Sequence, residues 1–116
     1  MARKTIAEMS FAKTYPYYVA KVVKKGRSEA ELREVIRWLT GYSDVQIDAQ
    51  IAADATFQTF FDEAPAYNPN AELITGVICG IRVEDIADPI EKKARQLDKL
   101  IDELAKGRPM DKILRA

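Results

Sequence analysis

The sequence predicts one all-α domain over residues 1–116, a single compact bundle of about six helices packed around a long C-terminal helix. Three features lead to this prediction. Apolar residues recur at helical spacing in several stretches, capping residues precede these stretches, and glycine follows most of them. A chain of 116 residues that is 47% hydrophobic and 31% charged is typical of one domain with one core.

The clearest helix is predicted between Asp88 and Gly107. Asp88 is a side-chain N-cap, Pro89 suits the first helical position, and Gly107 suits a left-handed stop. Oppositely charged residues one turn apart on the face opposite the apolar one, such as Lys99 with Glu103, are expected to face solvent. The predicted apolar face consists of Ile90, Ala94, Leu97, Leu100, Ile101 and Leu104.

Two helices are predicted before this one, in the first third of the chain. Residues 1–13 give weak signals and are expected to form a weakly ordered arm. Thr14 is then expected to cap the first helix. Ser28 and Glu31 form a capping box that begins the second helix, and Gly41 ends it.

The next stretch predicts two short helices. Ser43 and Gln46 repeat the capping pattern at the start of residues 44–54, where a strand-like alternation also occurs but the alanines and the cap favour a helix. Thr56 begins a short helix with a phenylalanine-rich face.

A polar loop follows at residues 62–72, and loops of this length often carry binding groups. Asn70 is expected to cap a helix over residues 73–79. That short apolar run could also be a strand. Cys79 is its last residue and has apolar neighbours, so we expect a buried and chemically inert thiol.

Composition excludes several classes of active site. The chain has no histidine and one cysteine, which rules out a histidine-based triad, a His/Cys zinc site and an internal disulfide. We therefore predict no catalytic residue, no metal and no cofactor. No long apolar run or signal-peptide pattern occurs, so a cytoplasmic protein without membrane insertion is expected.

Charge is distributed unevenly although the formal net charge is zero. Residues 1–40 carry +5, residues 41–91 carry −9 and residues 92–116 carry +4. These segments could neutralise one another within one molecule, or unlike patches could meet in a homo-oligomer.

A candidate interaction surface consists of Tyr17, Lys21 and Lys24, which share the polar face of the first helix. An aromatic side chain between lysines can stack on a nucleic-acid base, so weak binding through the basic N-terminal helices is one alternative. Sequence-specific DNA reading is not expected, because the helix at 44–54 carries Asp44 and Asp48 and no cation.

A candidate small-molecule or anion pocket is predicted near Arg37, Asn70 and Arg82. Trp38 lies at the edge of the apolar face of its helix, where an aromatic can anchor an interface. The full candidate binding set is Arg37, Trp38, Tyr42, Asn68, Asn70 and Arg82.

Several short motifs occur between residues 11 and 115, at 15–21, 25–28, 36–42, 57–61, 64–65, 68–70, 74–80 and 97–107. In these motifs the sequence resembles an uncharacterised bacterial family called domain of unknown function 2200. The resemblance implies membership of that family and brings no activity, cofactor or catalytic residue with it.

The leading functional hypothesis from the sequence is a small non-enzymatic interaction module that forms a homo-oligomer. The alternative is a small-molecule or anion-binding domain, which could be an enzyme, with its pocket near Arg37, Asn70 and Arg82. Nucleic-acid binding ranks third. A pocket formed by these three residues would favour the alternative.

Overall fold

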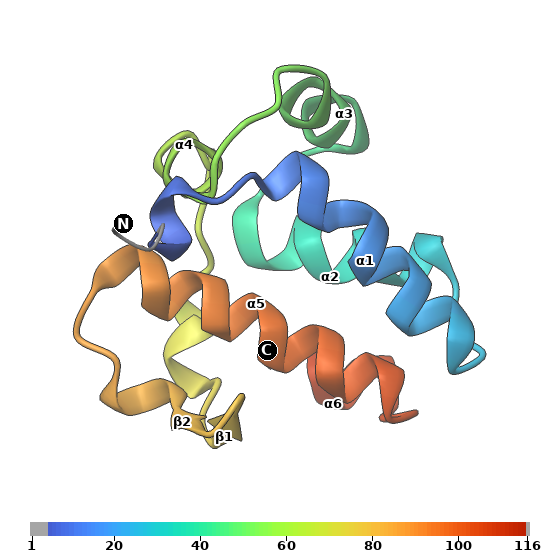
Figure 1. The fold of residues 1–116 in the computed structure, drawn as a ribbon. Coiled ribbons are helices and arrows are strands. Elements are labelled where there is room, and N and C mark those ends of the chain that lie inside the picture. Colours follow the sequence, from blue (N-terminus) through green and yellow to red (C-terminus); the bar gives the residue numbers. More distant parts are fainter. Residues whose placement is uncertain (1–4, 116) are drawn as a thin grey trace.

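The structure, a computed structural model, describes residues 5–115 and has the predicted all-α architecture (Figure 1). Three 3-10 helices, η1 (Ile6–Glu8), η2 (Pro69–Leu73) and η3 (Val83–Asp85), and a small sheet accompany the α-helices. Within this described part, no helix combines the length and apolar character needed to cross a bilayer. The α-helices are α1 (Phe11–Lys24), α2 (Glu29–Thr40), α3 (Asp44–Ala52), α4 (Phe57–Asp62), α5 (Pro89–Ala105) and α6 (Met110–Ile113).

Helix α5 is the predicted long helix, and α1, α2, α4 and α6 all pack against it (Figure 1). The Asp88 carboxylate accepts hydrogen bonds from the amides of Ile90 and Glu91, at 2.9 and 3.0 Å. At the other end Gly107 has φ +88°, and the Arg108 amide donates to the Glu103 carbonyl at 3.1 Å. These bonds form the N-cap and the left-handed stop that the sequence predicts, and the predicted apolar face is buried.

The polar side of α5 differs from the prediction at Glu103. This carboxylate is only 7% exposed, and the Arg115 guanidinium donates to its two oxygens at 2.8 and 2.7 Å. Lys99, the expected partner, instead donates to the Val77 carbonyl at 3.3 Å. The difference arises because the chain turns back after Gly107 and covers Glu103.

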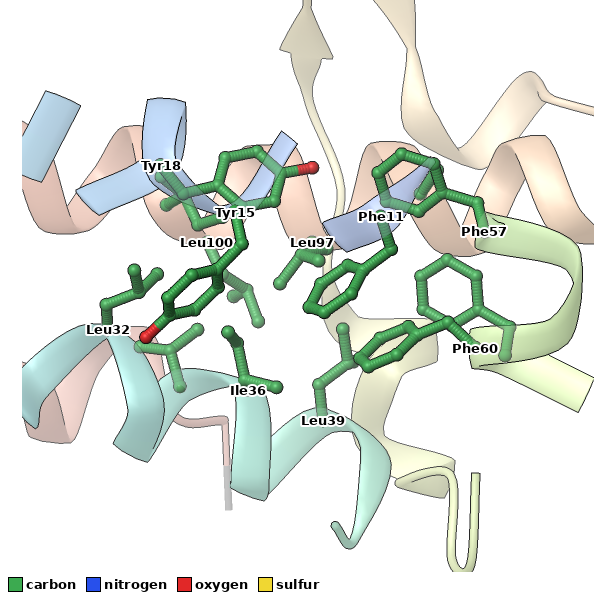
Figure 2. Packing of buried hydrophobic residues seen from close by; sticks show 14 of the residues in the cluster. Phe11, Tyr15, Tyr18, Leu32, Ile36, Leu39, Phe57, Phe60, Leu97 and Leu100 are labelled. Carbon is green, nitrogen blue, oxygen red and sulfur yellow. The ribbon is translucent and has the colours of Figure 1, made fainter. Parts of the chain in front are cut away.

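The core lies between α1, α2, α4 and α5, whose apolar side chains point toward one another in Figure 2. Phe11 of α1 stacks on Phe60 of α4, with ring centroids 3.8 Å apart. Phe61 meets Phe60 edge to face at 5.2 Å. The aromatic face of α4 is therefore the part of the core that joins the N-terminal helix to the middle of the chain.

The N-terminal region is more ordered than predicted. Helix α1 begins at Phe11 rather than after Thr14, because the Ser10 hydroxyl caps it by accepting from the Lys13 amide at 2.9 Å. Ser10 itself donates to Asp54 at 2.7 Å, which fixes the cap. Residues 5–13 thus belong to the folded body, and residues 1–4 of the expected arm lie outside the described residues.

The predicted helix over residues 73–79 is wrong. Strands β1 (Val77–Ile78) and β2 (Ile81–Arg82) pair there as an antiparallel hairpin, in which Ile78 faces Ile81. Cys79 and Gly80 form its turn, both with positive φ, at +53° and +77°. The expected buried thiol is also wrong, since Cys79 is exposed. A turn that needs two left-handed residues places the cysteine at the tip of the hairpin, away from the core.

Candidate ligand-binding groove

The loop at residues 62–68 closes the carboxyl end of α2. The Ala66 amide donates to the Thr40 carbonyl at 3.1 Å, and the Asn68 amide donates to the Leu39 carbonyl at 2.8 Å. The Asn68 side-chain amide donates to the Trp38 carbonyl at 3.2 Å. Carbonyls in the last turn of a helix have no partners within the helix. The loop therefore supplies those partners and is held firmly against α2.

Asn68 also begins the next element. Its side-chain oxygen accepts from the Asn70 amide at 2.8 Å and caps η2, whereas Asn70, predicted to cap a helix over residues 73–79, lies inside η2. Asn70 instead donates from its side chain to the Arg115 carbonyl at 3.0 Å. Both asparagines, predicted as binding residues, make hydrogen bonds that hold the fold together.

A groove lies between this anchored segment and the first turns of α5, with a volume of about 350 Å³. We call it the α5 groove. Tyr67 forms one wall, directly between the two anchor points Ala66 and Asn68. The full lining consists of Tyr67, Asn68, Pro69, Ala71, Glu72, Pro89, Lys92, Lys93 and Gln96. A volume of this size falls in the range of small-ligand pockets.

The floor of the α5 groove is a short chain of hydrogen bonds. Gln96 is 2% exposed; its side-chain nitrogen donates to the Ala71 carbonyl at 3.2 Å, and its oxygen accepts from the Tyr67 hydroxyl. Burial, and to a lesser degree the nearby Glu72, raises the pKa of Tyr67 well above its usual value. The Tyr67 hydroxyl is therefore neutral at physiological pH and serves as a fixed donor to Gln96.

The charges at the α5 groove are two ammonium groups and one carboxylate. The Lys93 ammonium lies 4.7 Å from the centroid of the Tyr67 ring, which holds it by a cation–π contact. The Lys92 ammonium lies 3.7 Å from the Glu72 carboxylate, a side chain that is itself largely exposed. An ion pair at this distance with one largely exposed partner is weak, so an anionic ligand could replace Glu72 as the partner of Lys92.

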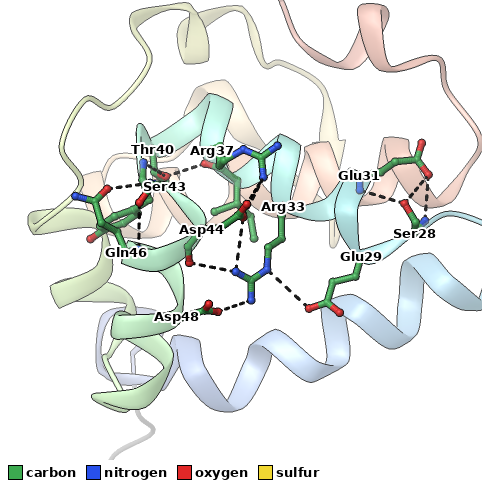
Figure 3. Close-up of polar contacts among 12 residues, drawn as sticks. Ser28, Glu29, Glu31, Arg33, Arg37, Thr40, Ser43, Asp44, Gln46 and Asp48 are labelled. Carbon is green, nitrogen blue, oxygen red and sulfur yellow. Dashed lines mark hydrogen bonds and ion pairs between the residues drawn. The ribbon is translucent and has the colours of Figure 1, made fainter.

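Arg37 is held by α3, away from the α5 groove. Its guanidinium donates to both Asp44 oxygens at 2.9 and 3.1 Å, while the neighbouring Arg33 contacts Asp48 at 2.7 Å (Figure 3). These pairs join the basic first segment of the chain to its acidic middle. Part of the uneven charge is therefore neutralised within one molecule.

The remaining predicted pocket residues lie in separate environments. Tyr42 is buried and donates to the Phe60 carbonyl at 2.7 Å. Trp38 is half-buried against the core, and Arg82 is exposed on the hairpin with Glu84 at 3.9 Å. Of the candidate set, Asn68 alone is among the residues that line the α5 groove, and Arg37, Asn70 and Arg82 contact different partners.

The predicted interaction surface on α1 is exposed. The Tyr17 side chain is 76% exposed, the largest value among the aromatic residues of the described chain. Lys24 is exposed as well. Lys21 is only partly available, because its ammonium lies 3.4 Å from Asp102 of α5.

Sequence reasoning missed Tyr67, Lys92, Lys93 and Gln96 as site residues. Lys92 falls on the polar side of an amphipathic helix, where lysines are ordinary. Lys93 lies one turn before Leu97, on the side of the apolar stripe, and Gln96 lies next to Leu97 at its border, so these two residues are signals that could have been read. A glutamine there predicts a buried amide that needs partners, and the partners come from residues 67–72.

The fold and the groove define a small helical domain with a ligand-sized hollow on its surface. A family described as "Uncharacterized protein conserved in bacteria (DUF2200)" matches residues 5–115, and the chain belongs to this family. The crystal structure of "uncharacterized protein SP1917" shares 42% sequence identity and superposes with a TM-score of 0.88, covering 98% of this chain and 93% of that chain. No curated protein matches the chain significantly.

Proposed function

We propose that this protein is a non-enzymatic binding module that holds a small anionic molecule in the α5 groove. The observation behind this proposal is the pair Lys92 and Lys93 on one wall of a 350 Å³ hollow, opposite the anchored Tyr67. The proposal assigns the ligand to the α5 groove, which Asn68 lines, rather than to a pocket near Arg37, Asn70 and Arg82. It takes the protein to be cytoplasmic, where the exposed Cys79 thiol would stay reduced.

The chemistry of the walls selects the ligand class. The ammonium groups favour a phosphate or a carboxylate, while Pro69, Ala71 and Pro89 offer an apolar surface for an organic part. The lining holds no arrangement of nucleophile and base, since its only carboxylate is the exposed Glu72 and its phenol is held by Gln96. Binding without catalysis is the simpler assignment.

Phenyl phosphate is the probe that combines both features, and we expect it to bind in the α5 groove. Backbone amide signals of residues 67–72 and 89–96 should shift saturably in NMR titrations. Lys93→Ala should weaken binding about tenfold, the usual effect of losing one charge-assisted hydrogen bond. Glu72→Gln should tighten binding, because it removes the one negative charge from the lining.

Lys106→Ala is the matched control, since this exposed lysine lies at the far end of the same helix and pairs with Asp102. Its affinity for phenyl phosphate should equal that of the unmodified protein. Equal weakening by Lys106→Ala and Lys93→Ala, or weaker binding by Glu72→Gln, would contradict an anion site in the groove.

A second candidate function is the homo-oligomeric interaction module. Met9 and Tyr17 are 43% and 76% exposed, and both line a shallow hollow of about 460 Å³ beside the start of α1. Methionine and tyrosine are enriched at the centres of protein interfaces. This hollow could receive the same surface of a second copy.

Light scattering after size exclusion tests this candidate over a range of protein concentrations. We expect a mass that rises with concentration, and Tyr17→Asp should keep the protein monomeric because a charge in the contact is unfavourable. Lys25→Asp provides an exposed control on the same segment. A monomer at all concentrations would exclude homo-oligomerisation as the function.

A further inference from the structure

The chain turns back over α5 after Gly107, and we call residues 109–115 the C-terminal strap. Two contacts hold the strap in place. Ile113 is completely buried in the core. The two terminal nitrogens of Arg115 donate to the two carboxylate oxygens of Glu103 at 2.8 and 2.7 Å. Glu103 is almost fully buried, and a paired contact between an arginine and a carboxylate is among the strongest that side chains form, so the strap is fixed on α5.

The strap also holds one wall of the α5 groove. The Asn70 side-chain amide donates to the Arg115 carbonyl at 3.0 Å. Asn70 belongs to η2 and stands between Pro69 and Ala71, which both line the groove. The bond from Asn70 to Arg115 therefore connects this wall of the groove to the strap.

Helix α5 reaches the same wall at two places. At the groove itself the Gln96 side chain donates to the Ala71 carbonyl at 3.2 Å. Glu103, which reaches the wall through Arg115 and Asn70, lies seven residues further along the helix. Seven residues are nearly two turns, so Gln96 and Glu103 share one face of α5 and lie about 10 Å apart along its axis. Together these two attachments fix how far the wall stands from α5, and so the width of the groove.

We propose that the C-terminal strap sets the width of the α5 groove, and that Asn70 and Arg115 are positioning residues for its ligand. The inference rests on the proposed function, because it concerns the same groove. Neither residue is part of the lining, so both act through η2. A ligand that bridges the ammonium groups of α5 and the apolar wall at η2 needs the two sides at one distance. Releasing the strap lets the wall move, and affinity falls because binding must then order the wall again.

The coupling between strap and groove is reciprocal. A ligand that binds only when the wall is in place also stabilises the contact that keeps it there, and by the same factor. Occupation of the groove therefore strengthens the bond from Asn70 to the strap. Any process that draws Arg115 away from Glu103 weakens ligand binding, which makes the strap a control point for a site that its residues do not line.

Amide hydrogen exchange of the ligand-free full chain tests the strap directly. The Ala71 and Ile74 amides form hydrogen bonds at the two ends of η2 and report on the wall. Asn70→Ala removes the donor to the strap and leaves the strap's own contact with α5 intact, so both amides should exchange about fivefold faster. Arg115→Lys keeps the charge but loses the paired contact, and it should accelerate the same two amides.

Phenyl phosphate affinity tests the coupling of the strap to the groove. Asn70→Ala and Arg115→Lys should each weaken binding about fivefold. The double variant should bind little more weakly than the weaker single variant, because both changes interrupt one relay. In the unmodified protein, phenyl phosphate should slow exchange of the Ile113 and Leu114 amides, which lie in the strap.

Arg108→Ala is the matched control. Arg108 also pairs with Glu103, at 3.2 Å, but within residues 5–115 it has no hydrogen bond or ion pair to η2. It should leave the affinity for phenyl phosphate and the exchange of the Ala71 and Ile74 amides unchanged. Equal effects of Arg108→Ala and Asn70→Ala would overturn the proposal, since a general loss of stability would then account for both.

The two measurements separate this inference from the proposed function. If the unmodified protein does not bind phenyl phosphate, the proposed function fails and the exchange of the Ala71 and Ile74 amides alone decides whether the strap holds the wall. If the protein binds phenyl phosphate but Asn70→Ala changes neither exchange nor affinity, the strap is overturned while the proposed function stands. Faster exchange with unchanged affinity would also overturn it, because the wall would then move without effect on the ligand. Additive losses in the double variant would contradict a single relay.

Discussion

Replacing Phe60 by alanine is expected to destabilise the fold by about 3–5 kcal/mol, the usual cost of removing a fully buried phenylalanine. Phe60 is completely buried, stacks on Phe11 at 3.8 Å and lies 5.2 and 5.0 Å from the rings of Phe61 and Tyr42. Its removal leaves a cavity at the point where α1, α2 and α4 meet. The rings around it come from α1, from α4 itself and from the loop after α2, so they cannot all move in to fill the space.

Urea denaturation of Phe60→Ala measures this effect as a loss of unfolding free energy. Val45→Ala is the control, because Val45 is also apolar and helical but is 78% exposed. That control should change stability by less than about 0.5 kcal/mol. Similar denaturation midpoints for both variants would mean that α4 does not belong to the core.

Gly41→Ala is expected to destabilise the protein by about 2–4 kcal/mol, which is more than the cost of forcing an alanine into the left-handed conformation. Gly41 has φ +80°, and a Cβ there would lie 2.8 Å from the backbone nitrogen of Ala66. The loop would have to move away, and the hydrogen bond from the Ala66 amide to the Thr40 carbonyl would break. The total combines about 1–2 kcal/mol for the left-handed alanine with the loss of this contact.

Gly26→Ala separates these two contributions. Gly26 has a similar φ of +84°, but nothing lies within 4 Å of an added Cβ. It should therefore cost only the conformational part, about 1–2 kcal/mol. If the two variants have equal unfolding free energies in urea, the close approach of Ala66 to Gly41 contributes nothing.

The helices with strong local signals could be predicted from the sequence. The capping boxes of Ser28 with Glu31 and of Ser43 with Gln46 are present as expected, and Asp88 begins α5. These signals are reliable because each cap is formed by residues within one turn of the helix that it begins. The strand-like alternation in α3 was resolved correctly for the same reason.

The errors occur where the decisive partner is distant in the chain. Helix α1 begins early because Ser10 is fixed by Asp54, which lies 44 residues away. The run at 73–79 reads equally well as helix or strand, and its hairpin depends on the left-handed pair Cys79 and Gly80. Local patterns carry no information about such contacts.

The candidate site was the least predictable part. The asparagine-rich loop was recognised as a segment near a site, but its asparagines complete helix ends rather than face a ligand. The sequence predicts the end of α2 at Gly41, but no local pattern shows which distant segment donates to its last carbonyls. Tyr67, Lys92 and Gln96 meet only because residues 66–68 are held against α2, so the groove follows from tertiary contacts.

The bond between Asn68 and Trp38 also gives the molecule an optical reporter. Trp38 is the single tryptophan of the chain, its ring lies half-buried against the core, and its carbonyl accepts from the Asn68 side chain. Tyr67, which walls the groove, is the residue next to Asn68. If the loop leaves α2, the hydrogen bond to the Trp38 backbone is lost and the packing around this residue changes, so the intrinsic fluorescence of Trp38 is a label-free signal for movement of the groove wall.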